Sequence, residues 1–180
     1  PSGDVACSST NATTQNVSAS GTVYNTPSSS AGSDITQCGT SSFTLAATNP
    51  SFGSGAWSVT SGSATITSSS SYNSGVTGVS AGSSATLRWT VSNGSCTAAT
   101  DDVDLTNNSN PTANAGSDVS KCGSAGTSLS ASGGASYSWS PNTGLSAANV
   151  ANPTASHTST TTYTVTVTDG NGCTDTDDVV

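Results

Sequence analysis

The sequence predicts an all-β protein made of two tandem Ig-like antiparallel β-sandwich domains. Three observations support this: apolar residues alternate with Ser and Thr in short stretches, turn residues recur about every ten positions, and one pattern occurs twice. Residues 161–180, TTYTVTVTDGNGCTDTDDVV, show the pattern most fully. Tyr163, Val165 and Val167 fall on one face of a strand and threonines on the other, and DGNG suits a hairpin turn.

Composition favours folded domains with small cores. The chain has 180 residues, of which 70 are Ser or Thr, and it contains no Glu and no Met. Leu, Ile, Val and Phe number only 23, a level that would indicate disorder in a highly charged chain. The net charge is a modest −8, and Thr and Val favour strands. Domains of this size bury only about 60% of their unfolded surface, so disulfides are expected to support them.

The same numbers exclude several classes of protein. Ten acidic residues against two cations make nucleic acid a poor partner. No run of 18 apolar residues is present, so this segment is not expected to span a membrane. Five cysteines without CxxC or Cys/His spacing indicate an oxidising compartment and not a zinc module. No signal peptide is recognisable, and a mature fragment or an excerpt of a longer chain is expected.

Residues 1–27 are too short to form a domain. They contain Cys7 and few apolar residues, and ACSSTNATTQNV is laid out like SCTAATDDVDLT farther along. We expect a strand-like arm or the end of a preceding repeat, with a flexible Ser/Thr linker as the alternative.

Residues 28–109 form the first predicted domain. Its short strands place apolar residues on one face in three groups: Phe43 with Leu45, Trp57 with Val59, and Leu87 with Trp89 and Val91. The polar segment NNSNP at 107–111 then marks a boundary, because proline disfavours helix before it.

Residues 110–180 form the second predicted domain and repeat the first. AGSD occurs at 31–34 and again at 115–118, and Cys38 and Cys122 keep the same shift of 84 positions. TDDV occurs at 100–103 and at 176–179. Trp57 and Trp139 lie 82 positions apart. Such self-similarity predicts a tandem array of one structural unit.

About 150 residues resemble a known family. ANAGSD with a cysteine four residues on, SWSPNTGLS, ANP, TTTYTVTVTD and NGC resemble the Ig-like and PKD-like repeats of very large bacterial cell-surface and type IX-secreted proteins, including gliding-motility adhesins. AWSVTSGSATIT with LRWTVSNGSC is similar to a sister repeat type of the same proteins. A PKD module usually has a WDFGDG-like strand where this chain has YSWSPNTG. The resemblance implies an extracellular, stalk-like or filament-forming role.

Disulfides are predicted between Cys38 and Cys96 and between Cys122 and Cys173. Each would close a loop of about 50 to 60 residues and contribute about 4 kcal/mol in the chain-entropy model. Cys7 is then left over. It is expected to pair with a preceding repeat or a neighbouring subunit, with a free thiol as the alternative.

No cofactor is expected, and calcium is the one alternative considered. Asp169, Asn171 and Asp175 could present oxygens to Ca²⁺, but three ligands are few and the equivalent turn SNGS has no carboxylate, so a plain turn is favoured. The acidic group Asp101, Asp102 and Asp104 is interpreted as a solvated strand end, with an inter-domain calcium junction as the alternative.

Catalytic patterns are weak. GVSAG at 78–82 matches GxSxG, but a nucleophile elbow needs a strand, a strained turn and a helix on a parallel sheet. His157, the only histidine, lies in the other unit within a Ser/Thr-rich run. Glycosidase chemistry needs two carboxylates in an apolar cleft, whereas the acids here crowd on turns and strand ends. The chain is therefore expected not to be an enzyme.

Aromatic residues are expected in the cores, with a sugar-stacking platform as the alternative. The residues concerned are Trp57, Trp89, Trp139, Tyr137 and Tyr163. Glycosylation is left open. The N-glycan sequons begin at Asn11, Asn16, Asn93 and Asn107.

The function predicted from the sequence is structural. We expect a repeat segment of an extracellular bacterial surface filament, stalk or adhesin that assembles end to end with neighbouring copies or repeats. Residues 1–27 could add a strand to an adjacent copy or pair with it through Cys7. Surface glycans or other cells are further candidate partners. The rival is a carbohydrate-binding or accessory module of a secreted enzyme, which would expose aromatics along one sheet face.

Overall fold

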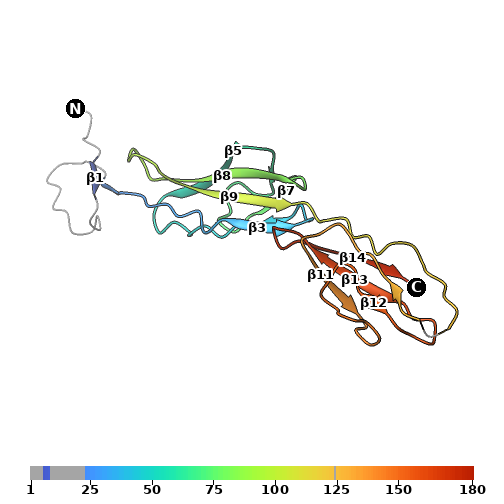
Figure 1. Ribbon diagram of the computed structural model, residues 1–180. Helices are drawn as coiled ribbons and strands as arrows, with labels where there is room; N and C mark the ends of the chain where they lie inside the picture. Colours follow the sequence, from blue (N-terminus) through green and yellow to red (C-terminus); the bar gives the residue numbers. More distant parts are fainter. Residues whose placement is uncertain (1–5, 9–22, 124) are drawn as a thin grey trace, which may run out of the picture. The chain divides into compact units, whose positions relative to one another are not determined.

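The computed structural model describes residues 6–8, 23–123 and 125–180 (Figure 1). The chain divides into two compact units, Pro1–Asn107 (unit 1) and Asn108–Val180 (unit 2). The division falls within the NNSNP segment. All regular secondary structure of the described residues is strand. A search of these residues for a long apolar helix that could cross a membrane finds none.

Apart from a short two-stranded sheet described below, unit 1 contains two sheets (Figure 1). The four-stranded sheet has the order β3-β9-β8-β5 and consists of Ile35–Cys38, Ala99–Asn108, Ser83–Ser92 and Ser54–Ser61. The three-stranded sheet has the order β4-β7-β6 and consists of Phe43–Thr44, Gly75–Thr77 and Thr65–Ile66. β5, β8 and β9 pair antiparallel, as do β4, β7 and β6.

The core of unit 1 follows from period-2 alternation in β8, where every second side chain is buried. The core residues are Ala31, Phe43, Leu45, Ala47, Trp57, Val76, Val79, Ala85, Leu87, Trp89, Val91, Val103 and Leu105. The rings of Trp57 and Trp89, directly paired across β5 and β8, are tilted with centroids 5.0 Å apart. Gly55 lies under the Trp89 ring, and a Cβ at this position would collide with that ring. The sequence prediction placed Val59 with Trp57 on the inner face, but Val59 is exposed beside a register shift in β5.

Unit 2 is a smaller version of the same arrangement. Its main sheet has the order β11-β13-β14 and consists of Ser136–Ser140, Tyr163–Thr168 and Thr174–Val179, all antiparallel. The second sheet pairs β10 (Thr127–Ser128) with β12 (Thr154–Ala155). The core residues are Ala115, Leu129, Ala131, Trp139, Ala155, Tyr163, Val165, Val167 and Val179. Tyr163, Val165 and Val167 are all buried, as the alternation predicted.

Two short strands of the predicted arm are described, and both lie in unit 1. β1 (Ala6–Ser8) pairs in parallel with β2 (Val23–Asn25). The rest of residues 1–22 lies outside the described residues.

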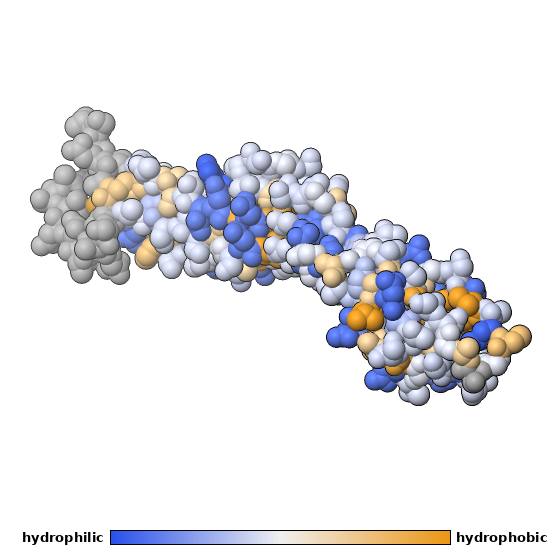
Figure 2. All heavy atoms as spheres, viewed as in Figure 1, coloured by the Kyte–Doolittle hydropathy of each residue, from blue (hydrophilic) through white to orange (hydrophobic). Residues whose placement is uncertain are grey.

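The visible surface of the described residues is mostly pale in Figure 2, the colour of weakly polar residues such as Ser and Thr. Apolar residues show in places on both units. Among the described residues, the exposed large hydrophobic side chains are Phe52, Val59, Tyr72, Val119, Val150 and Val180.

Candidate functional site

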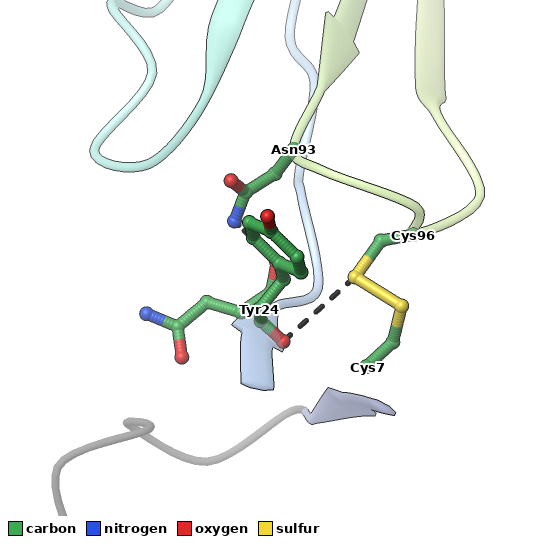
Figure 3. Close-up of a disulfide and its surroundings, with 5 residues drawn as sticks. Cys7, Tyr24, Asn93 and Cys96 are labelled. Carbon is green, nitrogen blue, oxygen red and sulfur yellow. Dashed lines mark hydrogen bonds between the residues drawn. A yellow bond between two sulfur atoms is a disulfide. The ribbon is translucent and has the colours of Figure 1, made fainter. Parts of the chain in front are cut away.

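The first structural device is a disulfide between Cys7 and Cys96 in unit 1 (Figure 3). Their Cα atoms are 5.4 Å apart, and the bridge spans 89 positions of sequence. The predicted pairing of Cys38 with Cys96 is therefore wrong. The expectation that Cys7 pairs outside its own unit is also wrong, because β1 and β2 lie against the turn that carries Cys96.

Packing around this disulfide explains the pairing (Figure 3). The amide nitrogen Nδ2 of Asn93 donates to the carbonyl oxygen of Asn25 at 2.8 Å. Gly94 has φ of +57°, and a Cβ there would lie 2.5 Å from the ring of Tyr24, so only glycine fits the turn. The sulfur of Cys96 lies 3.7 Å from the Tyr24 carbonyl oxygen. These contacts hold β2 against the β8–β9 turn and bring Cys7 within bonding distance.

The second predicted disulfide is also wrong. Cys122 is an exposed free thiol, so it does not pair with Cys173. Cys173 is buried and, like Cys38, is disulfide-bonded. The equivalence of Cys38 and Cys122 in sequence does not extend to their structure, because Cys38 ends a strand whereas Cys122 lies in a segment without regular structure.

The second device, which we call the carboxylate clamp, joins the AGSD motif to the last strand of its unit. In unit 1 the backbone amide of Ala31 donates to Oδ2 of Asp101 at 2.8 Å. In return, Oδ1 of Asp34 accepts the backbone amide of Asp104 at 2.9 Å. Two carboxylates thus satisfy backbone donors across 70 positions of sequence.

Unit 2 contains the same clamp. The amide of Ala115 donates to Oδ2 of Asp177 at 2.8 Å, and the amide of Val180 donates to Oδ1 of Asp118 at 3.0 Å. A further amide, that of Ala113, donates to Oδ2 of Asp175 at 2.9 Å. The clamp gives the repeated motifs AGSD and TDDV a shared structural role.

The aspartates considered for calcium have structural contacts as well. Oδ1 of Asp169 accepts the backbone amides of Asn171 and Cys173 at 2.8 and 2.9 Å, which closes the turn before β14. Asp175 accepts the Ala113 amide. Within residues 6–8, 23–123 and 125–180, no group of three or more His, Cys, Asp or Glu side chains is arranged to hold a metal ion.

The acidic strand end of unit 1 is not simply solvated. Arg88 donates from Nε and Nη2 to the two carboxylate oxygens of Asp102, both at 2.7 Å. These hydrogen bonds, aided by the positive charge, lower the pKa of Asp102. Oδ1 of Asp104 accepts the hydroxyl of Thr86 at 2.7 Å. The three aspartates of this group therefore each have a different hydrogen-bond partner within unit 1.

A third device, the tryptophan clip, occurs in both units and was not anticipated from the sequence. The backbone amide of Trp57 donates to Ser69 O at 2.7 Å, and its indole Nε1 donates to Ser71 O at 3.1 Å. Trp139 repeats this with Ala148 O at 2.8 Å and Val150 O at 2.9 Å. Each tryptophan thereby fastens a following loop at two carbonyls that are two residues apart.

Burial of the aromatics bears on the sugar-stacking alternative. Trp57, Trp89, Trp139 and Tyr163 are all buried, and Tyr137 is half-buried with its hydroxyl on Gly134 O. Burial also raises the pKa of Tyr163, whose hydroxyl donates to Thr143 O at 3.0 Å. Most of the proposed platform therefore faces the cores, as the strand alternation predicted.

The residues of the weak catalytic pattern have ordinary surroundings. Ser80 lies between β7 and β8, where its carbonyl accepts the amide of Ser83, and a helix does not follow. His157 lies in unit 2, with its Nε2 2.7 Å from Thr143 O and its ring against Tyr163. The strand–turn–helix context that a nucleophile elbow requires is not found around Ser80.

In two sequons the asparagine side chain donates a hydrogen bond to a backbone carbonyl. Asn107 is 1% exposed and donates from Nδ2 to Val79 O at 2.8 Å, and Asn93 donates to Asn25 O. A glycan attaches at this same nitrogen, so both positions are poor acceptors in the folded chain. Asn11 and Asn16 lie outside the described residues.

Comparison with known proteins supports the fold. No family model and no curated protein matches the chain. Among solved structures, the N-terminal eight Ig domains of Down syndrome cell adhesion molecule align over 88% of this chain with a TM-score of 0.53 and 10% identity. The chain consists of Ig-like β-sandwich units.

Two further solved structures are similar over most of the chain. The insect immune protein hemolin covers 92% of it with a TM-score of 0.46 and 14% identity, and Sidekick-1 immunoglobulin domains 1–4 cover 89% with a TM-score of 0.46 and 13% identity. The chain spans 27% to 52% of the length of these three structures. At such identities the similarity concerns the fold alone.

Proposed function

We propose that this chain is a structural repeat segment of an extracellular bacterial surface filament, stalk or adhesin. The observation that carries the proposal is that one unit is built twice with the same internal fastenings, the carboxylate clamp and the tryptophan clip. Each unit has a core of its own, so such units can be joined in tandem without depending on one another for stability.

Three properties support this function. The Cys7–Cys96 disulfide fits an oxidising, extracellular compartment. Ser and Thr cover the surface, which keeps a chain with few charges hydrated. Burial of the tryptophans in the cores favours a structural module over the rival carbohydrate-binding module.

The proposed mechanism is resistance to pulling and proteolysis. A disulfide across 89 positions prevents that part of the chain from extending under load. At about 3.4 Å per residue, it withholds about 300 Å of contour length.

Surface labelling of the native organism tests the proposal. Antibodies raised against the 180-residue chain are expected to label intact cells without permeabilisation, and electron microscopy is expected to show the label along fibres or stalks. Label confined to the cell interior, or to a soluble secreted enzyme, would contradict it.

Single-molecule pulling tests the mechanical part. The chain is pulled from its ends in a background with Cys38, Cys122 and Cys173 replaced by Ser. Reduction of Cys7–Cys96 is expected to lengthen the fully extended chain by about 300 Å. An unchanged length would show that the bridge does not limit extension.

A further inference from the structure

The sequence contains two Asn-Gly pairs, Asn93-Gly94 and Asn171-Gly172, and each lies in the turn before the last strand of its unit. Asn-Gly is the dipeptide in which an asparagine side chain deamidates most readily. Glycine has no Cβ to hinder the approach of its backbone nitrogen to the side-chain carbonyl, and attack by that nitrogen closes a five-membered succinimide ring. The surroundings of each pair decide whether the folded chain permits this attack.

The pair of unit 1 is held at both residues (Figure 3). Asn93 is half-buried, and its Nδ2 donates to the carbonyl oxygen of Asn25 at 2.8 Å. Gly94 packs against Tyr24, because a Cβ on Gly94 would lie 2.5 Å from atoms of that ring. Nδ2 is the nitrogen that leaves on deamidation, so ring closure at Asn93 has to break its hydrogen bond and disturb the packed turn.

The pair of unit 2 is held only through its backbone. Asn171 and Gly172 are both exposed, and apart from its chain neighbours no heavy atom lies within 4 Å of the place that a Gly172 Cβ would take. The backbone amide of Asn171 donates to Oδ1 of Asp169, but its side-chain amide makes no hydrogen bond with the residues that the structure describes. The Gly172 nitrogen donates to the Asp169 carbonyl oxygen at 3.2 Å, the upper limit for such a bond. Ring closure at Asn171 therefore has to break one long bond at an exposed hairpin tip, where local opening is easy.

We propose that Asn171 is a site of spontaneous deamidation in the folded chain and that Asn93 is protected from it. The Gly172 nitrogen bonds to Cγ of Asn171 as the Cγ–Nδ2 bond breaks, and Nδ2 leaves as ammonia with the proton lost from Gly172. Water then opens the succinimide at either carbonyl, giving aspartate or isoaspartate. One water is consumed and one ammonia is released, without oxidation or reduction. The inference is independent of the proposed bacterial surface function.

Deamidation changes the turn that precedes β14. Both products add a negative charge close to Asp169. Isoaspartate also routes the main chain through Cβ and Cγ of residue 171, which lengthens the loop between Asp169 and Cys173 by one atom. These two residues exchange hydrogen bonds: the Asp169 amide donates to Cys173 O, and the Cys173 amide donates to Asp169 Oδ1, both at 2.9 Å. A longer loop is expected to weaken both bonds.

Peptide mapping of the full 180-residue chain tests the proposal. The folded chain is incubated in mildly alkaline buffer, which favours attack by the backbone nitrogen, and samples are then reduced and digested. Trypsin cleaves after Arg88 and Lys121, so Asn93 and Asn171 fall on different peptides. Mass spectrometry with fragmentation measures the conversion at each position. Asn171 is expected to convert at least about tenfold faster than Asn93, because Asn93 must first lose its hydrogen bond and its packing.

Two controls separate structure from sequence. In urea with the disulfides reduced, both positions are expected to convert at similar rates, because unfolding removes the contacts of Asn93. Asn171→Gln keeps an amide, but its longer side chain closes a six-membered ring far more slowly. In the original chain, hydrogen exchange at the Asp169 and Cys173 amides is expected to rise during incubation, and in this variant it should stay constant.

Three results would overturn the proposal. The first is equal conversion of Asn93 and Asn171 in the folded chain. The second is no conversion of Asn171 in the folded chain over a period in which the unfolded chain converts. The third is an equal rise in exchange at the Asp169 and Cys173 amides in the original chain and the Asn171→Gln variant.

Discussion

The two units share two sets of internal hydrogen bonds but differ in their disulfide, one ion pair and the turn before the last strand. Each unit has a tryptophan clip that fastens a loop and a carboxylate clamp that fastens the AGSD segment to the last strand. Among the described residues, unit 1 alone has the Cys7–Cys96 bridge and a bidentate Arg88–Asp102 ion pair. Unit 2 closes the turn before β14 with the carboxylate of Asp169.

This contrast separates what the repeat requires from what it tolerates. The clip binds a loop to β5 and β11, which lie at the edges of their sheets, and the clamp gives backbone amides of the AGSD segment and the last strand carboxylate acceptors. The turn before the last strand varies from SNGSC to DGNGC, because either a packed tyrosine or an Asp side chain can hold it. The clip and the clamp therefore occur in both units, whereas the turn, the disulfide and the Arg88–Asp102 pair differ between them.

Removing the disulfide is expected to change the relative stabilities of the two units most. Replacing both Cys7 and Cys96 by Ser should lower the free energy of unfolding of unit 1 by about 4 to 5 kcal/mol in the chain-entropy model for a loop of this length. Native-state hydrogen exchange measures this change, because the protection of amides in β8 reports the stability of unit 1 and that of amides in β13 reports the stability of unit 2.

The matched control is Cys122→Ser, which removes an exposed free thiol and should change neither set of amides. Equal loss of protection in β8 and β13 would contradict the view that this bridge serves unit 1 alone.

Removing a carboxylate of the clamp is expected to cause the next largest loss in the free energy of unfolding. Asp177→Ala removes the acceptor of the Ala115 amide and should destabilise unit 2 by about 1.5 to 3 kcal/mol, the range for a hydrogen bond to a charged group. Asp101→Ala should cost unit 1 less, because Asp101 is more exposed than Asp177. Chemical denaturation with exchange readouts in each unit measures both.

The neighbouring Asp178 provides the control for the clamp. Asp178→Ala removes the same charge from the exposed side of β14, where it corresponds to Asp102 but faces Thr164 instead of an arginine. Its effect should be small. If Asp178→Ala and Asp177→Ala were equally costly, net charge and not the clamp would explain the loss.

Much of the fold was predictable because strand alternation is local. Tyr163, Val165 and Val167 were placed correctly in the core from a period of two alone. The cysteine pairing was not predictable, since it depends on where β1 and β2 pack and no spacing in the sequence encodes that. Equivalence by repeat position suggested Cys38 with Cys96, and tertiary packing of Tyr24 on Gly94 decided otherwise.

The sequence contains a signal for the clamp, but its structural meaning was not predicted. AGSD and TDDV recur almost unchanged, and the sequence interpretation made Asp101, Asp102 and Asp104 a solvated strand end. The recurrence is explained by reciprocal bonds between the two motifs. For the tryptophan clip the sequence showed only the recurring donors, Trp57 and Trp139, because the acceptors are backbone carbonyls, which any residue provides.

Removing the indole hydrogen bond of the clip is expected to cause a moderate loss of stability, and the loss should differ between tryptophans that form this bond and Trp89. Trp57→Phe and Trp139→Phe keep an aromatic ring but leave the carbonyls of Ser71 and Val150 without their indole donor, at a cost of about 1 to 3 kcal/mol each. Trp89 differs, because its buried Nε1 has no hydrogen-bond partner among the described residues. Trp89→Phe should therefore cost less than Trp57→Phe in the same unit, as measured by urea unfolding.

A larger loss for Trp89→Phe would mean that ring volume, and not the indole hydrogen bond, dominates at these positions. Comparison of the three variants within one set of conditions makes that distinction.

The Arg88–Asp102 pair is expected to have the smallest effect, because both side chains are exposed to solvent. Arg88→Thr gives unit 1 the residue that unit 2 has at the equivalent position, Thr164. In the folded chain, Arg88 lowers the pKa of Asp102, so the pair adds stability above the unfolded pKa of about 4 and loses it as the pH falls through the folded value. The Arg88→Thr substitution should therefore raise the pKa of Asp102, which a carboxyl NMR titration measures. At pH 7 the variant should be slightly less stable than the original chain. This difference should vanish in strong acid and shrink in about 1 M salt. An Asp102 titration that is the same in both chains would mean that the hydrogen bonds from Arg88 do not persist in solution.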